Sequence, residues 1–318
     1  SNSNSNSNSS SKDDDDTSAF GGVPVVGAAV GKFHTCLVLE NGELWSCGSN
    51  KMGQCGINSS IEEIHSFRKC HVAGFGKKAS SGPPTKKSKL AASASASAPD
   101  PVEIVQVSCG EQFSVALSSK GHLYSAGSGE FGQLGNGATG EHFVTANKLA
   151  FDNATKFERR AIFCDQDSGK DVNANTAIVP LPDSSEIVIR SIACGKNHAI
   201  ALEAPTQSGT APRLFTWGCG DYGCLGHGKQ ADEYFPRLIS TFSEQKALFL
   251  SNAPRKVTAG AQCGMVLTEM GHVYYWGRHR PVGEATMRPT LVDALANNSH
   301  VIVSVSGGNQ TLVCATKN

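Results

Sequence analysis

The chain has 318 residues, of which 28 are Lys or Arg and 28 are Asp or Glu, so its formal net charge is zero. This balance excludes a global field that draws the chain to nucleic acid or anionic lipid, and any such contact needs a local basic patch. The length suits one large all-β domain or two small ones, and the 34 glycines are an excess that proves to be periodic.

Two segments have biased compositions. Residues 1–19 are a Ser/Asn run followed by Asp13 to Asp16, and we predict a disordered tail because so little of it can be buried. Residues 74–101 contain Lys86-Lys87-Ser88-Lys89 and a Ser/Ala alternation, which is typical of a flexible inserted loop. The lysine cluster is either a nuclear-import signal or an ordinary solvated patch.

Residues 20–318 repeat one unit. In its first copy, apolar runs from Phe33 to Leu39 and from Leu44 to Cys47 flank Asn41-Gly42. Asn-Gly between two such runs predicts a β-hairpin in which both turn residues have positive φ.

Glycine spacing supports the repeat most strongly. A first glycine and a post-strand glycine bracket each hairpin, two further glycines follow in the first three copies, and a fifth copy begins near the end of the chain. These repeat glycines are Gly31, Gly48, Gly53 and Gly56, then Gly110, Gly127, Gly132 and Gly135, then Gly195, Gly218, Gly223 and Gly226, then Gly260 and Gly277, and finally Gly307.

One such hairpin cannot bury both of its faces, so neighbouring copies must stack. Antiparallel sheets arranged radially around an axis are the standard solution. We therefore predict an all-β protein, a β-propeller of about four and a half units over residues 20–318, with 145–186 as an insertion between repeats.

The segment from Ile192 to Leu202 and the Gly132-Gln133-Leu134-Gly135 turn resemble the regulator-of-chromosome-condensation (RCC1-like) repeat family. Asn50 to Gln54 and Arg159 to Phe163, which lie between the repeat motifs, are similar to its telophase-disc branch. The resemblance implies a seven-bladed propeller, of which this chain supplies part. The chain departs from the pattern at Phe113, Cys263 and Gln310, where the family has the repeat histidine.

The resemblance also implies protein binding without bond chemistry of its own. The implied partner is a small GTPase of the Rac, Ral or Ran type, regulated by guanine-nucleotide exchange in mitosis or cytoskeletal control. The alternative is a non-catalytic adaptor for chromatin, centromere or microtubule components. A propeller hydrolase is a third hypothesis, which the lack of a convergent polar set disfavours. The implied location is nucleus and cytoplasm, with the centromere or spindle midzone in mitosis.

Direct nucleotide binding is not expected. Two G-x-G-x-x-G matches, at 127–132 and 218–223, occupy the same slot of the repeat and lack the βαβ context of a dinucleotide site. Gln133 and Cys224 stand where a phosphate-binding loop needs Lys. We expect no cofactor.

No metal site is expected either. His34 and His198 recur at one repeat position, which favours structural imidazoles over a metal or a general base. The 11 cysteines include no C-x-x-C pair and are interpreted as reduced, strand-buried thiols. The three tryptophans, Trp45, Trp217 and Trp276, are interpreted as packing residues between blades.

Candidate partner-facing residues lie in turns and in the insertion. Lys51, Glu130 and Asp221 occupy equivalent turns after the post-strand glycine, where a rigid scaffold presents its contacts. Arg159 and Arg160 fall in the insertion and are candidates for pairing with an acidic partner surface. The alternative for all five is an ordinary solvated side chain.

Overall fold

The computed structural model describes residues 20–57, 60–73, 102–145, 148–162, 187–205, 211–244, 252–278, 283–296, 301–308 and 311–317. The predicted tail 1–19 and the predicted loop 74–101 lie outside these residues. The all-β prediction is confirmed, because the strands form four antiparallel sheets of four strands and two small sheets of two strands.

Each four-stranded sheet is one blade, and in three of them the strands are neighbours in chain order. Blade 1 comprises β1 (Val25–Val30), β2 (His34–Leu39), β3 (Leu44–Ser49) and β4 (Glu63–Lys69). Blade 3 comprises β11 (Ile189–Cys194), β12 (His198–Glu203), β13 (Leu214–Gly218) and β14 (Glu233–Leu238). Blade 4 comprises β15 (Pro254–Gly260), β16 (Cys263–Thr268), β17 (Val273–Gly277) and β18 (Thr286–Leu291). A fifth blade begins with β19 (Ile302–Gly307) and β20 (Leu312–Thr316).

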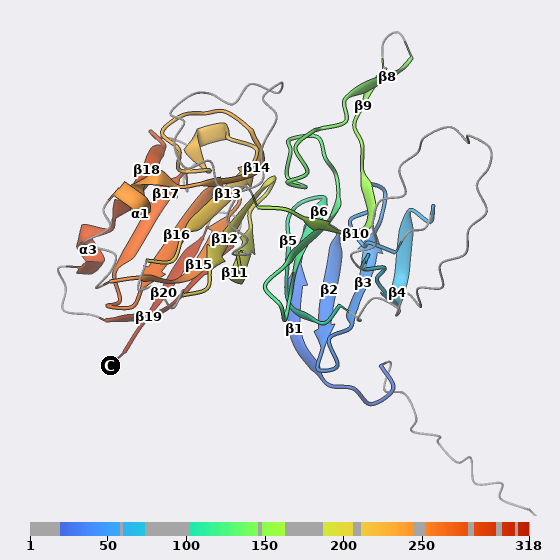
Figure 1. The fold of residues 1–318 in the computed structure, drawn as a ribbon, viewed down its shortest axis with the longest axis horizontal. Helices are drawn as coiled ribbons and strands as arrows, with labels where there is room; N and C mark the ends of the chain where they lie inside the picture. Colours follow the sequence, from blue (N-terminus) through green and yellow to red (C-terminus); the bar gives the residue numbers. More distant parts are fainter. Residues whose placement is uncertain are drawn as a thin grey trace, which may run out of the picture.

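Blade 2 differs from the others in its third connection. It comprises β5 (Ile104–Cys109), β6 (Phe113–Ser118), β7 (Leu123–Gly127) and β10 (Ala154–Arg160). A separate hairpin of β8 (His142–Thr145) and β9 (Lys148–Ala150) interrupts it and projects from the blades (Figure 1). Part of the predicted insertion 145–186 therefore belongs to the blade, because residues 154–160 form its fourth strand, β10. Residues 163–186 lie outside the described part of the chain.

Short helices occur in the connections: η1 (Asp221–Gly223), α1 (Ser240–Glu244) and α3 (Asp293–Ala296). Within the described ranges, no helix has the length and apolar character needed to cross a bilayer.

The first strand of each blade lies innermost. β1 packs against β5, β5 against β11, β11 against β15, and β15 against β19, and Figure 1 shows the sheets succeeding one another in chain order. The hydrophobic core is divided accordingly, with one cluster of buried side chains in each space between neighbouring blades. This arrangement of sheets around an axis is that of a propeller.

The hairpin turns differ from the prediction in one detail. The Gly42 amide donates to the Leu39 carbonyl and Gly42 has a φ of 80°, but Asn41 is not in the positive-φ region. The turn is therefore a type I turn followed by a glycine in the left-handed region, the geometry common in longer hairpin loops. A one-residue difference in loop length separates it from the predicted turn.

The post-strand glycines follow from the register of the second and third strands. Gly48 pairs with His34 and has a φ of 104°. A Cβ at Gly48 would lie 2.4 Å from the Phe33 carbonyl oxygen, so only glycine fits. Gly127, Gly218 and Gly277 hold the same register in the next three blades.

The first glycines allow neighbouring blades to touch backbone to backbone beside the axis. A Cβ at Gly31 would lie 2.5 Å from the Gly110 carbonyl oxygen, and one at Gly195 would lie 2.5 Å from that of Gly260. The adjoining amides make use of this proximity, since Lys196 donates to the Ala261 carbonyl at 2.9 Å. Successive blades are thus joined at their inner ends.

A hydroxyl group fixes the turn that follows the third strand in three blades. The hydroxyl lies two residues before the post-strand glycine. It donates to the carbonyl of the residue that directly precedes the last repeat glycine of the turn. The pairs are Ser46 with Cys55, Ser125 with Leu134 and Thr216 with Leu225, at 2.7, 2.8 and 2.7 Å.

Two indoles tie blades together, as expected of packing tryptophans. Trp217 is buried and donates from Nε1 to the Gln133 carbonyl of the preceding blade at 3.0 Å. Trp276 does the same to the Cys224 carbonyl at 2.9 Å. Trp45 is different, because it is half-buried and donates to the Glu43 carboxylate.

The inner glycine contact predicts a large penalty for one methyl group. Gly195→Ala is expected to destabilise the fold by about 1–3 kcal/mol, the range for overpacking a tight site. Urea unfolding followed by circular dichroism measures this difference. Gly27→Ala is the matched control, because its Cβ would meet no atom nearer than 3.6 Å; equal midpoints for the two variants would contradict the assigned role.

Candidate functional site

Two sets of turns meet at one end of the blades. The amide of Ser49, the last residue of β3, donates to the Phe33 carbonyl in the turn between β1 and β2. The Ser128 amide donates to the Gln112 carbonyl in the same way in blade 2. We call this end, formed by the turns between first and second strands and between third and fourth strands, the turn face.

The structure brings Lys51, Glu130 and Asp221 to the turn face. All three are exposed and occupy the same point of successive blades. Each is followed directly by a large, half-exposed side chain. Sequence reasoning did not identify these three following residues, although they recur at a fixed position of the repeat. They are Met52, Phe131 and Tyr222. Protein-binding surfaces commonly have an apolar centre and a polar rim, and large apolar side chains bordered by charged groups fit that pattern.

Tyr222 has an unusual backbone. Its φ of 57° is the one positive value among the described residues other than glycine. The Arg278 guanidinium carbon lies 3.3 Å from the centre of its ring, so a cation–π contact from blade 4 holds it. The strained backbone of Tyr222, together with the contact between its ring and Arg278, marks this turn as a candidate contact point.

The projecting hairpin is a second surface feature that sequence reasoning missed. Phe143 is 71% exposed and Val144 is 57% exposed on β8. The hairpin lies in the connection between the third and fourth strands of blade 2, so it rises from the turn face (Figure 1). Apolar side chains grouped on an exposed element indicate an interaction site.

A carboxylate near the axis joins three blades on the turn face. Glu111 receives hydrogen bonds from the ammonium groups of Lys32 and Lys196, the latter at 3.3 Å. Burial opposes ionisation, but the two ammonium groups hold the pKa of Glu111 below its ordinary value. The lysines are half-exposed and flank the inner rim of the face.

The two arginines are placed differently from the turn residues. Both belong to β10, and the Arg160 side chain is only 9% exposed. Arg160 donates from Nε to the Ser125 hydroxyl at 2.6 Å and also pairs with Glu158. Arg160 therefore stabilises blade 2 internally. The prediction that it faces a partner is wrong, because its guanidinium is buried and contacts Ser125 and Glu158 of the same blade. Arg159 is half-buried.

The two G-x-G-x-x-G segments form turns between third and fourth strands. Gly127 ends β7, and Gly218 ends β13. The second segment ends in the three-residue η1, which lies within it and is too short to supply the helix N-terminus of a dinucleotide site.

The recurring histidines are buried beside the first glycines. Burial lowers the pKa of both His34 and His198 to about 4. His198 Nε2 is buried without a hydrogen-bond partner, which suits a neutral ring. His34 differs, because its Nε2 lies 2.8 Å from the Ser114 hydroxyl of blade 2.

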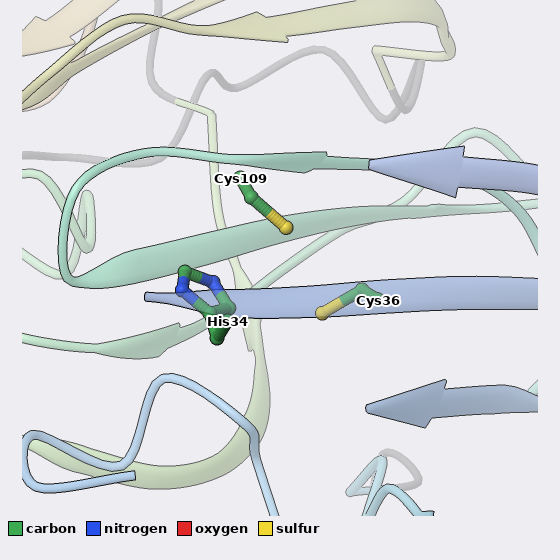
Figure 2. Close-up of side chains that lie close together, drawn as sticks. All are labelled: His34, Cys36 and Cys109. Atoms are coloured by element: carbon green, nitrogen blue, oxygen red, sulfur yellow. The ribbon is translucent and has the colours of Figure 1, made fainter. Parts of the chain in front are cut away.

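His34 also belongs to the one group of possible metal ligands found among the described residues. The ligand atoms of His34, Cys36 and Cys109 lie within 4.8 Å of one another, and all three side chains are buried. Figure 2 shows the sulfur of Cys109 directed toward the strand that carries His34 and Cys36. A hydrogen bond with the neighbouring Cys109 thiol and burial raise the pKa of Cys36 well above its ordinary value.

These features define a class of protein: a β-propeller built from repeats, whose turns present charged and large apolar side chains at one end of the blades. Models of the regulator of chromosome condensation (RCC1) repeat match residues 41–117 and 213–267, and a second model of that repeat matches 25–54 and 104–133. The chain belongs to the RCC1 repeat family.

Curated relatives narrow the resemblance to one branch. The chain is 31% identical to the RCC2 homolog of Xenopus laevis over 91% of this chain and 47% of that protein. It is 30% identical to RCC2 of Homo sapiens over 92% of this chain and 46% of that protein. The chain thus spans about half the length of these relatives.

Solved structures share the fold. Human WBSCR16 aligns with a TM-score of 0.62 and 20% identity, over 93% of this chain and 58% of that one. Prp20p of Saccharomyces cerevisiae, described with its binding to Gsp1p and histones, aligns with a TM-score of 0.57 and 21% identity, over 93% and 57%.

The buried imidazole of His198 predicts a pH-dependent stability. The pKa of His198 in the folded chain, about 4, lies below the ordinary histidine value of 6.5, so the unfolded state binds the additional proton as the pH falls through 6.5. The contribution of the neutral His198 ring to the free energy of unfolding is fully present above pH 6.5 and is lost as the pH falls toward 4. The loss between pH 7 and pH 5 is about 2 kcal/mol.

His198→Phe tests this contribution, because Phe113 occupies the equivalent position in blade 2. Urea midpoints at pH 7 and pH 5 are expected to differ less in the variant than in the parent chain. Identical pH dependence in both would show that His198 does not stay neutral in the fold.

Proposed function

We propose that the chain is a protein-binding scaffold that engages a small GTPase of the Rac, Ral or Ran type through the turn face. Its action is guanine-nucleotide exchange or a related regulation in mitosis or cytoskeletal control. The observation that carries the proposal is the repetition of Lys51, Glu130 and Asp221 at equivalent exposed turns, each beside a large side chain. Membership of the RCC1 repeat family and the Gsp1p binding of Prp20p support it.

Exchange on a GTPase requires no bond chemistry from this chain. A scaffold accelerates nucleotide release when it binds the nucleotide-free GTPase more tightly than the nucleotide-bound form, because only a differential affinity shifts an equilibrium. The projecting hairpin adds exposed Phe143 and Val144 beside the turn face, and a rigid propeller holds both features in place.

A non-catalytic adaptor for chromatin, centromere or microtubule components is the second candidate. The histone binding described for Prp20p favours it. For either function we expect the protein in nucleus and cytoplasm, with the centromere or spindle midzone as its mitotic position.

Release of a fluorescent GDP analogue separates the two functions. The full chain is added in turn to Rac-, Ral- and Ran-type GTPases, and faster release from one of them is the expected result. Binding without acceleration would favour the adaptor, and absence of both binding and acceleration with all three would contradict the GTPase proposal.

Charge reversal on the turn face is expected to weaken that interaction. A Lys51→Glu, Glu130→Lys, Asp221→Lys variant should bind the responsive GTPase at least tenfold more weakly, about 1.4 kcal/mol. Titration calorimetry measures the affinity. Glu40→Lys is the control, because Glu40 is exposed in the turn between β2 and β3 at the opposite end of the blade; an equal loss there would remove the turn face from the interface.

The hairpin is tested separately. Phe143→Asp removes an exposed apolar side chain that lies outside the blades. The rate of GDP release that the chain stimulates is expected to fall about tenfold, as for loss of a hot-spot aromatic residue. The thermal midpoint should stay unchanged, since Phe143 is 71% exposed. Unchanged release kinetics would exclude the hairpin from the contact.

A further inference from the structure

The space between blades 1 and 2 contains a cluster of polar side chains that the next two blade junctions lack. His34 and Cys36 lie on β2, while Cys109 ends β5 and Ser114 lies on β6. The Ser114 hydroxyl lies 2.8 Å from His34 Nε2 and 3.7 Å from the sulfurs of both Cys36 and Cys109. Four donor atoms thus face one another in a buried space.

The repeat itself supplies an internal comparison. The positions equivalent to His34, Cys36 and Cys109 do not hold a complete donor set at either of the next two junctions. They are Phe113, Val115 and Cys194 between blades 2 and 3, and His198, Ile200 and Ala259 between blades 3 and 4. The fold therefore does not require two thiols and an imidazole at this point.

The missing indole makes the same junction distinctive. Ala126 occupies the position that Trp217 and Trp276 hold in blades 3 and 4. The Ser114 hydroxyl donates to the Gln54 carbonyl at 2.9 Å, in place of the indole bond that the later blades give to the preceding turn. Polar donors have therefore replaced an apolar packing group at one junction.

We propose that His34, Cys36 and Cys109 form a zinc-binding site that joins blade 1 to blade 2, with the Ser114 hydroxyl at the fourth position. Zinc takes Cys and His ligands in tetrahedral sites, where neighbouring ligand atoms lie about 3.3–3.8 Å apart. The present separations, all within 4.8 Å among the three ligands, reach that geometry by small side-chain rotations.

Charge and ligand chemistry together favour a divalent cation that binds sulfur, as zinc does. Two thiolates and a neutral imidazole cancel the double positive charge of Zn²⁺, so the filled site is neutral and its burial is not opposed by a net charge. A monovalent soft ion would leave one negative charge, and Mg²⁺ or Ca²⁺ prefers oxygen ligands.

Binding must release protons and accompany folding. Zn²⁺ displaces one proton from each thiol, and these two protons leave for solvent. His34 binds as a neutral ring, with its proton on the nitrogen that does not face the metal. Because Cys36 is 0% and His34 3% exposed, the metal enters while the blades assemble.

The test is zinc content after refolding. The full chain, without a histidine tag, is refolded with Zn²⁺, dialysed and analysed for metal by mass spectrometry, and one zinc per chain is expected. Refolding with Co²⁺ should give thiolate-to-metal charge-transfer absorption. Absence of this absorption and of stoichiometric zinc in the parent chain would overturn the proposal without reference to any variant.

The variants use the replacements that the repeat itself contains. His34→Phe, Cys36→Val and Cys109→Ala copy Phe113, Val115 and Ala259, and each is expected to lower bound zinc at least tenfold. Cys55→Leu is the matched control, because Cys55 is a buried thiol of the same blade and Leu134 is its counterpart. Zinc retained by Cys36→Val, or lost equally in Cys55→Leu, would show that the metal binds elsewhere.

Discussion

Backbone contact between neighbouring blades beside the axis is the constraint on which the structure depends. Gly31 lies against the Gly110 carbonyl and Gly195 against that of Gly260, at distances that exclude any side chain. Because the inner strands meet this closely, the outer strands are free to spread apart, and the four hydrophobic clusters fill the spaces between them. The same inner turns also hold the Lys32, Glu111 and Lys196 group at the rim of the turn face.

Polar ties complete the blades where apolar packing cannot. A hydroxyl within each of blades 1, 2 and 3 satisfies one carbonyl group of the turn after the third strand. The next blade satisfies a second carbonyl, through an indole for the turns of blades 2 and 3 and through the Ser114 hydroxyl for the turn of blade 1. The turns that carry Lys51, Glu130 and Asp221 are therefore held from two sides. A surface built in this way loses little entropy when it meets a partner, which suits a binding scaffold.

Much of the fold is readable from the sequence because glycine reports geometry directly. Gly48 and Gly195 stand where a Cβ would collide, so their spacing reveals the blades. β10 was hidden because an inserted hairpin broke that spacing. The inward position of Arg160 depends on Ser125 of another strand, and the grouping of Cys109 with Cys36 depends on packing between blades. Contacts of this kind have no fixed separation along the chain.

The indole bonds have a direction, because each joins a blade to the turn of the blade before it: Trp217 reaches back to Gln133, and Trp276 reaches back to Cys224. On a ribosome, which delivers the chain from its N-terminus, each turn would wait for its last hydrogen-bond donor until the next sheet has emerged. Cotranslational folding of this protein is therefore expected to lag one unit behind synthesis, with the most recently made sheet always the least ordered.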